Sequence, residues 1–345
     1  MLDLNDKKIT GSAIKLNSAD NVAVALSEIK AGTNLLGTNI TTREIVPPGY
    51  KVAICDISQG DPIKKYDVTV GFAKSDIIAG TMLHNHNIEF REFDRDYAYA
   101  KHYKPVEKFP EDSRATFQGY KRADGRAGTR NFISIVSTVN CSATVVHAIA
   151  DHFNEERLSQ YPNVDGVAAF SHNTGCGMEL TGEPMNLLHR TLAGYIKHPN
   201  VAASLVVGLG CERCQVGGLF ETQKLQPEQT LRTLVMQEAG GTRQTISRGI
   251  SIIEELLEIA NQSKRETVSA SHLMVGLQCG GSDSFSSITA NPSLGNAIDI
   301  LSKHGGTGIL SETPEIYGVE HTLTARAASI AVSYTHLTLP TIITV

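Results

Sequence analysis

The sequence predicts an α/β protein in which a small, mainly β domain precedes a domain built on a parallel sheet. Two patterns support this fold class. Up to about residue 90 the chain shows short apolar runs separated by turn signals, and from Phe117 onward apolar strands alternate with amphipathic helices. Many of the 30 glycines follow apolar runs directly, as expected of tight turns at strand ends. The 345 residues suffice for about two domains.

The amino-terminal segments "NVAVALSEI", "REIVPPGYKVAICDI" and "YDVTVGFAKSDIIAGTML" predict short strands with little helix. The turn signal Pro47-Pro48-Gly49 lies between two of them. The next stretch, "REFDRDYAYAKHYKPVEKFPEDSRA", is charged, contains two prolines and has no apolar period. We therefore expect a small β domain over residues 1–92 and a linker or extended arm over residues 93–113.

The second pattern predicts a parallel sheet covered by helices on both faces, in a Rossmann-like α/β domain over residues 114–326. The strands are expected at residues 132–138, 166–170, 202–207, 234–236, 273–277 and 308–310. Helical spacing recurs over residues 145–153, 187–196 and 246–257. Asn291-Pro292 is a favourable start for a further helix over residues 294–303, which Gly305 and Gly306 would end.

The last residues, 327–345, differ from the rest of the chain. "AASIAVSYTHLTLPTIITV" contains no Asp, Glu, Lys or Arg, and its Pro-interrupted, β-branched pattern does not continue the helical pattern before it. We expect this segment to lie outside the α/β domain.

Composition excludes several classes of protein. The 31 Lys and Arg residues against 36 Asp and Glu residues give a net charge of -5, without a basic block, so nucleic acid and anionic membranes are not expected partners. No signal peptide and no apolar run long enough to span a bilayer is present, which predicts a cytoplasmic protein. Its six cysteines are expected to be reduced: Cys55, Cys141, Cys176, Cys211, Cys214 and Cys279.

Chemically active side chains follow five of the expected strands. Because a parallel sheet binds ligands beyond the carboxyl ends of its strands, these side chains predict a site. They are Cys141, then His172 and Cys176, then Cys211 and Glu212, then Cys279 and Asp283, and finally Glu312 and Glu315. A lone buried cysteine is most often a small apolar residue, but the repetition favours function.

Several chemistries remain open at this edge. Thiolates with His and carboxylates can bind a soft or borderline metal, a thiolate beside a His can act as a nucleophile, and His and carboxylates can exchange protons. Cys211 and Cys214 form a CxxC without a second pair, so a structural zinc or redox site is weakly indicated. Phosphate binding is also weakly indicated, because neither GxGxxG nor the P-loop spacing is present.

Two further motifs can each be interpreted either as part of a functional site or as ordinary solvent-exposed residues. His84 and His86 lie two residues apart, so on an extended strand both would face one side and could ligate a metal or move protons; the alternative is two solvated side chains. The loop "FQGYKRADGRAGTRN" carries Arg126 and Arg130, which could hold a carboxylate through paired hydrogen bonds or belong to a solvated turn.

Four long motifs resemble the altronate dehydratase and galactarate dehydratase family: "FQGYKRADGRAGTRN", "GLGCERCQ", "LQCGGSDSFSSITANPSLG" and "ILSETPEIYGVEH". The resemblance implies an amino-terminal SAF-type domain, a central α/β domain and a further carboxy-terminal α/β domain. It also implies a lyase that removes water from a six-carbon sugar acid, with Fe²⁺ or a similar divalent ion such as Mn²⁺ as cofactor.

Within this family the branch is open. The run His84, His86 and Asn87 resembles the altronate enzymes, whereas "YPNVDGV" and "KRETVSASHLMVGLQCGGSD" resemble the galactarate enzymes. We favour altronate, because the histidine motif contains the side chains that could ligate a metal or transfer protons in the reaction.

Two departures from the family stand out. Cys214 replaces a residue that is commonly polar in the family. The resemblance ends at Arg326, so we expect the carboxy-terminal domain to be missing altogether, and "SYTHLTLPTI" resembles translated adapter sequence. A truncated chain would expose an apolar face and is expected to be inactive or poorly soluble.

The resemblance and the motifs together give an expected site. Its assignments are catalytic His84, His86, His172, Glu212 and Asp283; substrate-binding Arg126, Arg130, Asn87, Gly280 and Gly281; and metal-binding His84, His86, Cys176 and Cys279. The expected partner is a small-molecule sugar acid, with a homo-oligomer possible. The alternatives are a sugar-acid-binding module without catalysis, and a cysteine-dependent hydrolase using Cys176 and His172.

Overall fold

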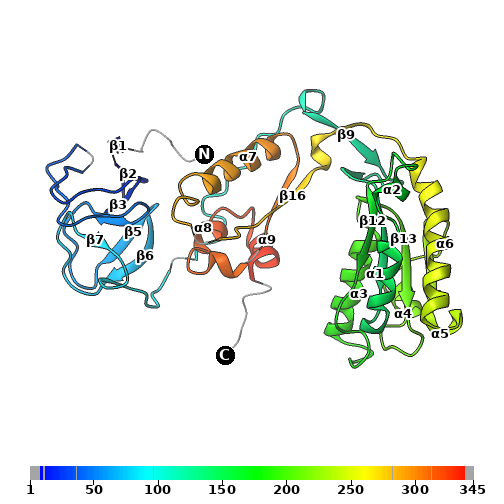
Figure 1. Cartoon of the computed structure of the whole chain (residues 1–345). Helices are drawn as coiled ribbons and strands as arrows, with labels where there is room; N and C mark the ends of the chain where they lie inside the picture. The colour runs from blue at the N-terminus through cyan, green and yellow to red at the C-terminus, as the bar shows by residue number, and fades with distance from the viewer. Residues whose placement is uncertain are drawn as a thin grey trace. The chain divides into compact units, whose positions relative to one another are not determined.

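The computed structural model describes residues 8–10, 12–35, 37–95, 97–281, 283–311 and 313–338. The chain forms two compact units, of which the first joins residues 1–109 with residues 274–345 and the second spans residues 110–273 (Figure 1). The described residues include no helix both long and apolar enough to span a bilayer.

The amino-terminal part of the first unit is built from short antiparallel strands, as predicted. One sheet has the order β1-β2-β3-β4-β7 and the other the order β5-β6-β8. The strands of the first are β1 (Lys8–Thr10), β2 (Ala13–Lys15), β3 (Val22–Ala25), β4 (Lys51–Ala53) and β7 (Met82–Leu83). Those of the second are β5 (Pro62–Lys65), β6 (Val68–Ala73) and β8 (Ile88–Glu89). Small and β-branched residues such as Ala23, Val52 and Ile63 are fully buried in this domain.

The described residues of 91–109 form neither strand nor helix and run as an extended arm. The arm is anchored by backbone hydrogen bonds to the later part of the same unit. Ala100 N donates to Thr324 O at 3.0 Å, and Phe109 N donates to Lys303 O at 2.8 Å.

Residues 274–338 add a small β-α-β element to the first unit. The strands β16 (Met274–Leu277) and β17 (Thr307–Leu310) pair in parallel, and α7 (Ala290–Lys303) connects them. Short helical turns follow at η5 (Thr313–Ile316), α8 (His321–Thr324), α9 (Ile330–Ser333) and η6 (Tyr334–Thr338).

The second unit holds the predicted parallel sheet, with the strand order β12-β11-β13-β14. Its strands are β11 (Phe132–Ser137), β12 (Gly166–Phe170), β13 (Val201–Gly208) and β14 (Leu231–Val235). Its helices and helical turns are η2 (Glu111–Ser113), η3 (Asn140–Ser142), α1 (Ala143–Asp151), α2 (Glu155–Leu158), α3 (Glu183–Ile196), α4 (Val216–Gln223), α5 (Met236–Ala239), α6 (Thr242–Asn261) and η4 (Ala270–His272). In Figure 1 the long helices α1, α3 and α6 run alongside these strands.

Both faces of this sheet are buried, which explains the nearly continuous apolar strands. Ile135 and Leu205 pack with α1 and α6 on one face, while Val136 and Val206 pack with α3 and α4 on the other. The predicted α/β sheet with helices on both faces is therefore confirmed for the strands β11 to β14.

A three-stranded antiparallel sheet, β10-β9-β15, brings the two ends of the second unit together. It consists of β9 (Thr116–Lys121), β10 (Ala127–Gly128) and β15 (Glu266–Ser269), and Thr116 pairs with Ser269.

One prediction about the sheet is wrong. The segments at 273–277 and 308–310 do form parallel strands, but as the separate pair β16–β17 in the first unit. Cys279 and Asp283 therefore do not share a sheet edge with His172 and Glu212. The expected five strand ends divide into two groups, and Glu312 lies outside the described residues.

Candidate functional site

The carboxyl edge of the four-stranded sheet is formed by three loops that are tied to one another. Asn140 N, after β11, donates to Thr174 O at 3.0 Å, and Arg213 N, after β13, donates to Gly175 O at 2.9 Å. Gly175 has a φ of 96°, and a Cβ there would collide with the Thr138 carbonyl. Only glycine fits where these loops approach so closely.

Glu212 is the buried carboxylate of this edge, with only 4% of the residue exposed. Its Oε1 accepts hydrogen bonds from Thr138 Oγ1 at 2.9 Å and from Leu209 N at 3.1 Å, while its Oε2 accepts one from Gly210 N at 2.6 Å. Both oxygens are thus bound by donors of this chain. Glu212 holds the turn after β13, which is a positioning role.

His172 is held by hydrogen bonds at both ring nitrogens. Nδ1 accepts from Thr174 N at 3.2 Å, and Nε2 lies 3.1 Å from the Ser137 carbonyl, which can only accept, so Nε2 carries the proton. Burial lowers the pKa of His172, and the hydrogen bond to Ser137 opposes this shift. The imidazole is therefore neutral near pH 7, with both nitrogens engaged within the loops.

The cysteines of the second unit fall into two kinds. Cys141, Cys176 and Cys211 are exposed, whereas Cys214 is fully buried with Leu219 and Val206 in the apolar core. Burial, together with the charge of Glu212, raises the pKa of Cys214 to about 12, so it remains a thiol. A redox or metal-binding CxxC is thereby disfavoured. The cysteine hydrolase is disfavoured too, because both nitrogens of His172 already have partners.

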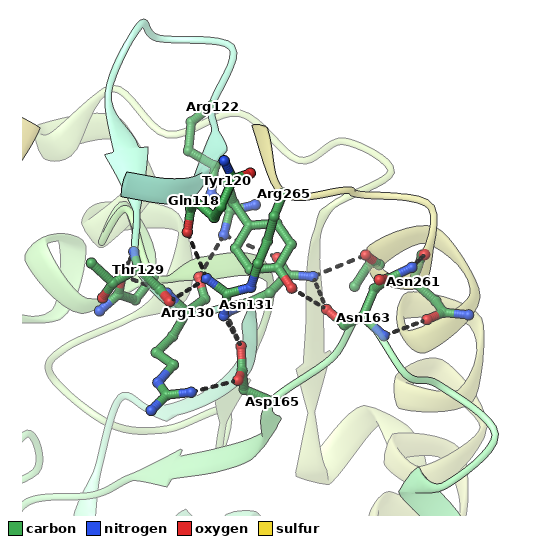
Figure 2. A network of polar contacts seen from close by, with 12 residues as sticks. Gln118, Tyr120, Arg122, Thr129, Arg130, Asn131, Asn163, Asp165, Asn261 and Arg265 are labelled. Atoms are coloured by element: carbon green, nitrogen blue, oxygen red, sulfur yellow. Dashed lines mark hydrogen bonds and ion pairs between the residues drawn. The ribbon is translucent and has the colours of Figure 1, made fainter. Parts of the chain in front are cut away.

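Arg126 and Arg130 lie at the opposite edge of this sheet, just before β11 begins. Arg130 Nη1 is 3.1 Å from Asp165 Oδ1, and Arg126 pairs with Asp124 at 2.6 Å. Figure 2 shows Arg130 and Asp165 within a polar network that also contains Asn131 and Arg265. The prediction that these arginines share a site with His172 and Glu212 is wrong, since the length of β11 separates them.

This network at the amino edge is structural. The buried Asn131 donates through Nδ2 to Asn163 O at 2.7 Å and to Ala260 O at 3.0 Å, and its backbone N donates to Asp165. Arg265 lies over the ring of Tyr120 at 4.6 Å from its centroid (Figure 2). These contacts fix the start of β11 and the end of α6.

The histidines of the first unit lie in a turn between β7 and β8. His84 O accepts hydrogen bonds from Asn87 N at 3.0 Å and from Ile88 N at 2.9 Å, so the segment is coiled. The expectation of an extended strand with both imidazoles on one side is wrong. His84 and His86 are exposed, and the ring of His84 stacks on Tyr50 with centroids 5.1 Å apart.

Asn87 shapes this turn. Its side chain is buried, with Oδ1 accepting from His84 N and Nδ2 donating to Met82 O, both at 2.9 Å. Its amide has these partners within the turn, so the structure gives it a supporting role beside the histidines.

An open pocket of about 780 Å³ lies between the end of β16 and the start of α7 in the first unit. Its lining includes Cys279, Gly280, Gly281, Asp283 and Asn291. Asp283 Oδ1 accepts from Phe285 N at 3.0 Å, and a Cβ on Gly280 or Gly281 would meet nothing within 4 Å. Both glycines leave open space beside the thiol and the carboxylate.

The loop that follows Asp283 contacts the amino-terminal β domain. A Cβ on Gly49 would lie 2.9 Å from Ser284 Cβ, and Tyr66 Oη donates to Ser287 O at 2.9 Å. Tyr50, next to Gly49, stacks on His84. The histidine turn and the Asp283 loop are thus connected through Gly49 and Tyr50.

A metal centre was expected from His84, His86, Cys176 and Cys279. Across the residues that the structure describes, no group of three His, Cys, Asp or Glu side chains converges as a metal site would require. Three of the expected ligands belong to the first unit and Cys176 belongs to the second. Within each unit, the described residues therefore do not form a complete metal site.

Three family models match the chain in consecutive order. They are the altronate/galactarate dehydratase SAF domain at residues 11–91, the second domain of D-galactarate dehydratase/altronate hydrolase at 119–261, and the D-galactarate/altronate dehydratase C-terminal domain at 270–340. The chain belongs to the altronate and galactarate dehydratase family.

Curated members of this family align over most of the chain. An altronate dehydratase from Escherichia coli (strain K12) is 37% identical over 90% of this chain, and one from Bacillus subtilis (strain 168) is 34% identical over 92%. A galactarate dehydratase (L-threo-forming) from Escherichia coli (strain K12) is 33% identical over 95%. The chain spans 62%, 63% and 64% of the lengths of these three proteins.

The match of the C-terminal family model corrects one expectation. The carboxy-terminal domain is not missing altogether, because residues 270–340 match it, and the match continues beyond Arg326. The β16–α7–β17 element and the pocket beside α7 lie in this matched segment rather than in the central domain.

The sequence analysis did not single out Lys65, which contacts the loop after Asp283, or Lys51, whose charge acts on Lys65. Lys65 Nζ lies 2.9 Å from Ser287 Oγ, and Lys51 is close enough to Lys65 to affect its pKa. A lysine in a short strand ordinarily indicates an exposed position, so no signal in the sequence pointed to them.

Proposed function

We propose that this chain acts in a sugar-acid dehydratase, a hydro-lyase that converts D-altronate to 2-dehydro-3-deoxy-D-gluconate and water in hexuronate catabolism. The ordered match of three domains of one dehydratase family carries this proposal. The two altronate dehydratases among the relatives support the choice of substrate.

The reaction requires loss of the C2 proton, which is only weakly acidic beside a carboxylate, and departure of the 3-hydroxyl group. A base must take the proton and an acid must protonate the leaving oxygen, after which the enol becomes the ketone. Histidine exchanges protons readily near neutral pH, and His84 and His86 are exposed on the turn that Asn87 supports. We assign the proton transfers to this turn.

The pocket beside α7 is the proposed place for the sugar acid. Asp283 and Asn291 offer polar groups for the substrate hydroxyls, and Gly280 and Gly281 leave room beside them. The contact chain from His84 through Tyr50 and Gly49 to Ser284 supports a shared site for the turn and this pocket. His172 and Glu212, whose polar atoms have internal partners, are assigned to maintaining the loops of the second unit.

Dependence on Fe²⁺ or Mn²⁺ remains a proposal of its own. When bound, such an ion would stabilise negative charge on the substrate carboxylate as the C2 proton leaves. Since no described cluster completes its ligand set, we assign no step to it.

The test is an assay of the chain, joined to the carboxy-terminal remainder of a family member because it spans 62% of the Escherichia coli altronate dehydratase. It measures release of a 2-keto-3-deoxy acid from altronate, galactarate and gluconate, with and without Fe²⁺ under reducing conditions. We expect release from altronate, and a loss of about 100-fold or more in His84→Gln and His86→Gln. His102→Gln, an exposed histidine in the extended arm, is the matched control. Unchanged turnover in the first two variants would refute their role.

Galactarate is the alternative substrate, favoured by the galactarate dehydratase among the relatives, and its product would be 5-dehydro-4-deoxy-D-glucarate. Release from galactarate alone would select this branch. A sugar-acid-binding role without catalysis is the second alternative, and binding of altronate without turnover, with or without metal, would select it.

A further inference from the structure

Two lysines of the amino-terminal β domain, Lys51 and Lys65, lie partly buried. Lys51 begins β4 and Lys65 ends β5. Burial lowers the pKa of each, and the charge of Lys51 further lowers the pKa of Lys65, while Asp20 opposes that shift. Among the described residues neither ammonium group forms an ion pair. Two neighbouring cations in such surroundings favour an anion.

The turn that follows Lys65 has an unusual backbone conformation and contacts the loop after Asp283. Tyr66 and Asp67 have φ values of 58° and 57°, a conformation that glycine and asparagine adopt more easily than tyrosine. In this turn Tyr66 Oη donates to Ser287 O, and Lys65 Nζ donates to Ser287 Oγ at 2.9 Å. Strained turns of this kind are found at ligand sites.

Ser287 lies next to residues that line the pocket. Ser286 and Asp283, on one side of it in sequence, and Thr289 and Asn291, on the other, contribute to the pocket wall. Lys65 therefore contacts, through Ser287, the loop whose neighbouring residues line the pocket. The pocket lining contains the carboxylate of Asp283 but no Lys or Arg, so a cation for an anionic substrate has to come from a neighbouring element.

We propose that Lys51 and Lys65 form a subsite that binds a carboxylate of the sugar acid. The ammonium group of Lys65 holds the carboxylate next to Ser287, and Lys51 adds the second positive charge. The identity of the ligand rests on the proposed dehydratase function, whereas the anion preference rests on the two lysines. The β domain thereby contributes to substrate binding as well as the histidine turn.

The test measures binding and turnover separately. Calorimetric titration of the chain with altronate and galactarate, and with the uncharged galactitol, is compared for wild type, Lys65→Met, Lys51→Met and Lys65→Arg. The matched control is Lys64→Met, because Lys64 adjoins Lys65 but pairs with Asp67 at 3.6 Å. We expect both methionine variants to weaken binding of the two acids about tenfold or more. Lys65→Arg should retain most of the affinity, and Lys64→Met should change it by about twofold or less.

Two further variants separate ligand binding from loop anchoring. Ser287→Ala removes the hydroxyl that Lys65 contacts, and Tyr66→Phe removes the other hydrogen bond to Ser287. If Lys65 binds ligand, both variants should weaken acid binding by about threefold or less. Losses equal to that of Lys65→Met would show that Lys65 only anchors the loop, and would overturn the proposal.

The remaining outcomes are also decisive. Lysine-dependent binding of acids without any turnover supports the subsite while the dehydratase proposal fails. Turnover by wild type with unchanged KM and binding in both methionine variants overturns the subsite and leaves the dehydratase proposal intact. Absence of acid binding by wild type overturns the subsite, and an equal loss of galactitol binding in Lys65→Met would do the same.

Discussion

At the scale of single residues, the environment of His172 predicts how stability depends on pH. Burial holds the pKa of His172 below its ordinary value of 6.5. The unfolded chain therefore binds a proton below pH 6.5 that the folded chain resists, so the free energy of unfolding falls as the pH drops below that value. Above pH 6.5 the imidazole is neutral in both states and contributes no pH dependence.

We expect the free energy of unfolding to decrease between pH 6.5 and pH 5.5, with at most about 1.4 kcal/mol per pH unit from this one histidine. His172→Gln should reduce this slope without abolishing it, because burial also lowers the pKa of His189 and His198. Hydrogen exchange of the β11 and β13 amides at several pH values measures the effect. An unchanged slope in His172→Gln would contradict it.

The sequence predicted which polar residues lie at the carboxyl edge of the four-stranded sheet, but it did not predict what their side chains contact. His172 and Glu212 were identified at strand ends, yet their hydrogen bonds with Ser137, Thr138 and Gly210 show that they support loops. A polar residue that serves a turn and one that serves a substrate have the same position in a strand-end motif. Only the partners of each polar atom separate the two roles, and those partners come from other loops.

At the scale of elements, the loops at the carboxyl edge depend on glycine. Gly175→Ala would place a Cβ against the Thr138 carbonyl in a left-handed conformation. We expect a loss of at least about 2 kcal/mol in the free energy of unfolding of the second unit. The matched control is Gly217→Ala in α4, where a Cβ meets nothing within 4 Å. It should be neutral or stabilise by up to about 1 kcal/mol.

Hydrogen exchange of β11 and β13 again provides the measurement, since it reports on the second unit alone. Equal effects of the two substitutions would show that the loops adjust to the added methyl group.

Element types were predicted well, but sheet membership was not. Apolar runs and helical spacing predicted β11, β12 and β13 and the helices that cover them, because burial on both faces leaves a local signature. The same signature appears in β16 and β17, although they form their own sheet in the other unit. The pattern of apolar residues in a segment indicates that it forms a strand. It does not indicate which other strand that segment pairs with.

At the scale of the whole molecule, the β16–α7–β17 element exposes apolar side chains. Met274 is 67% exposed and Leu310 is 57% exposed, and Ile309, Ile300 and Leu294 are exposed as well. Exposed apolar residues gathered on one small element favour self-association.

The double substitution Met274→Lys with Leu310→Lys should therefore reduce self-association at a given protein concentration, as measured by light scattering. Ile45→Lys is the control, because Ile45 is 57% exposed but belongs to the amino-terminal β domain. If the control reduces scattering as much as the double variant, net charge explains the effect and the exposed element does not.

The sequence did not predict that the two parts of the first unit fold together. Its two parts, residues 1–109 and 274–345, are separated in sequence by the entire second unit. The contacts that join them, such as those of Lys65 and Tyr66 with Ser287, follow no periodic pattern in the sequence. Long-range contacts of this kind follow from the folded structure and leave no trace in local propensity.

The pairing of β9 with β15 has a consequence for the order of folding. Lys65 and Ser287 are 222 residues apart in sequence, but Thr116 and Ser269 become neighbours once the second unit has folded. Folding of the inserted unit thus shortens the loop that must close before the first unit can assemble, which lowers the entropy cost of closure by roughly 1 kcal/mol. The second unit should accordingly form first, and the contact around Ser287 should be among the last to appear.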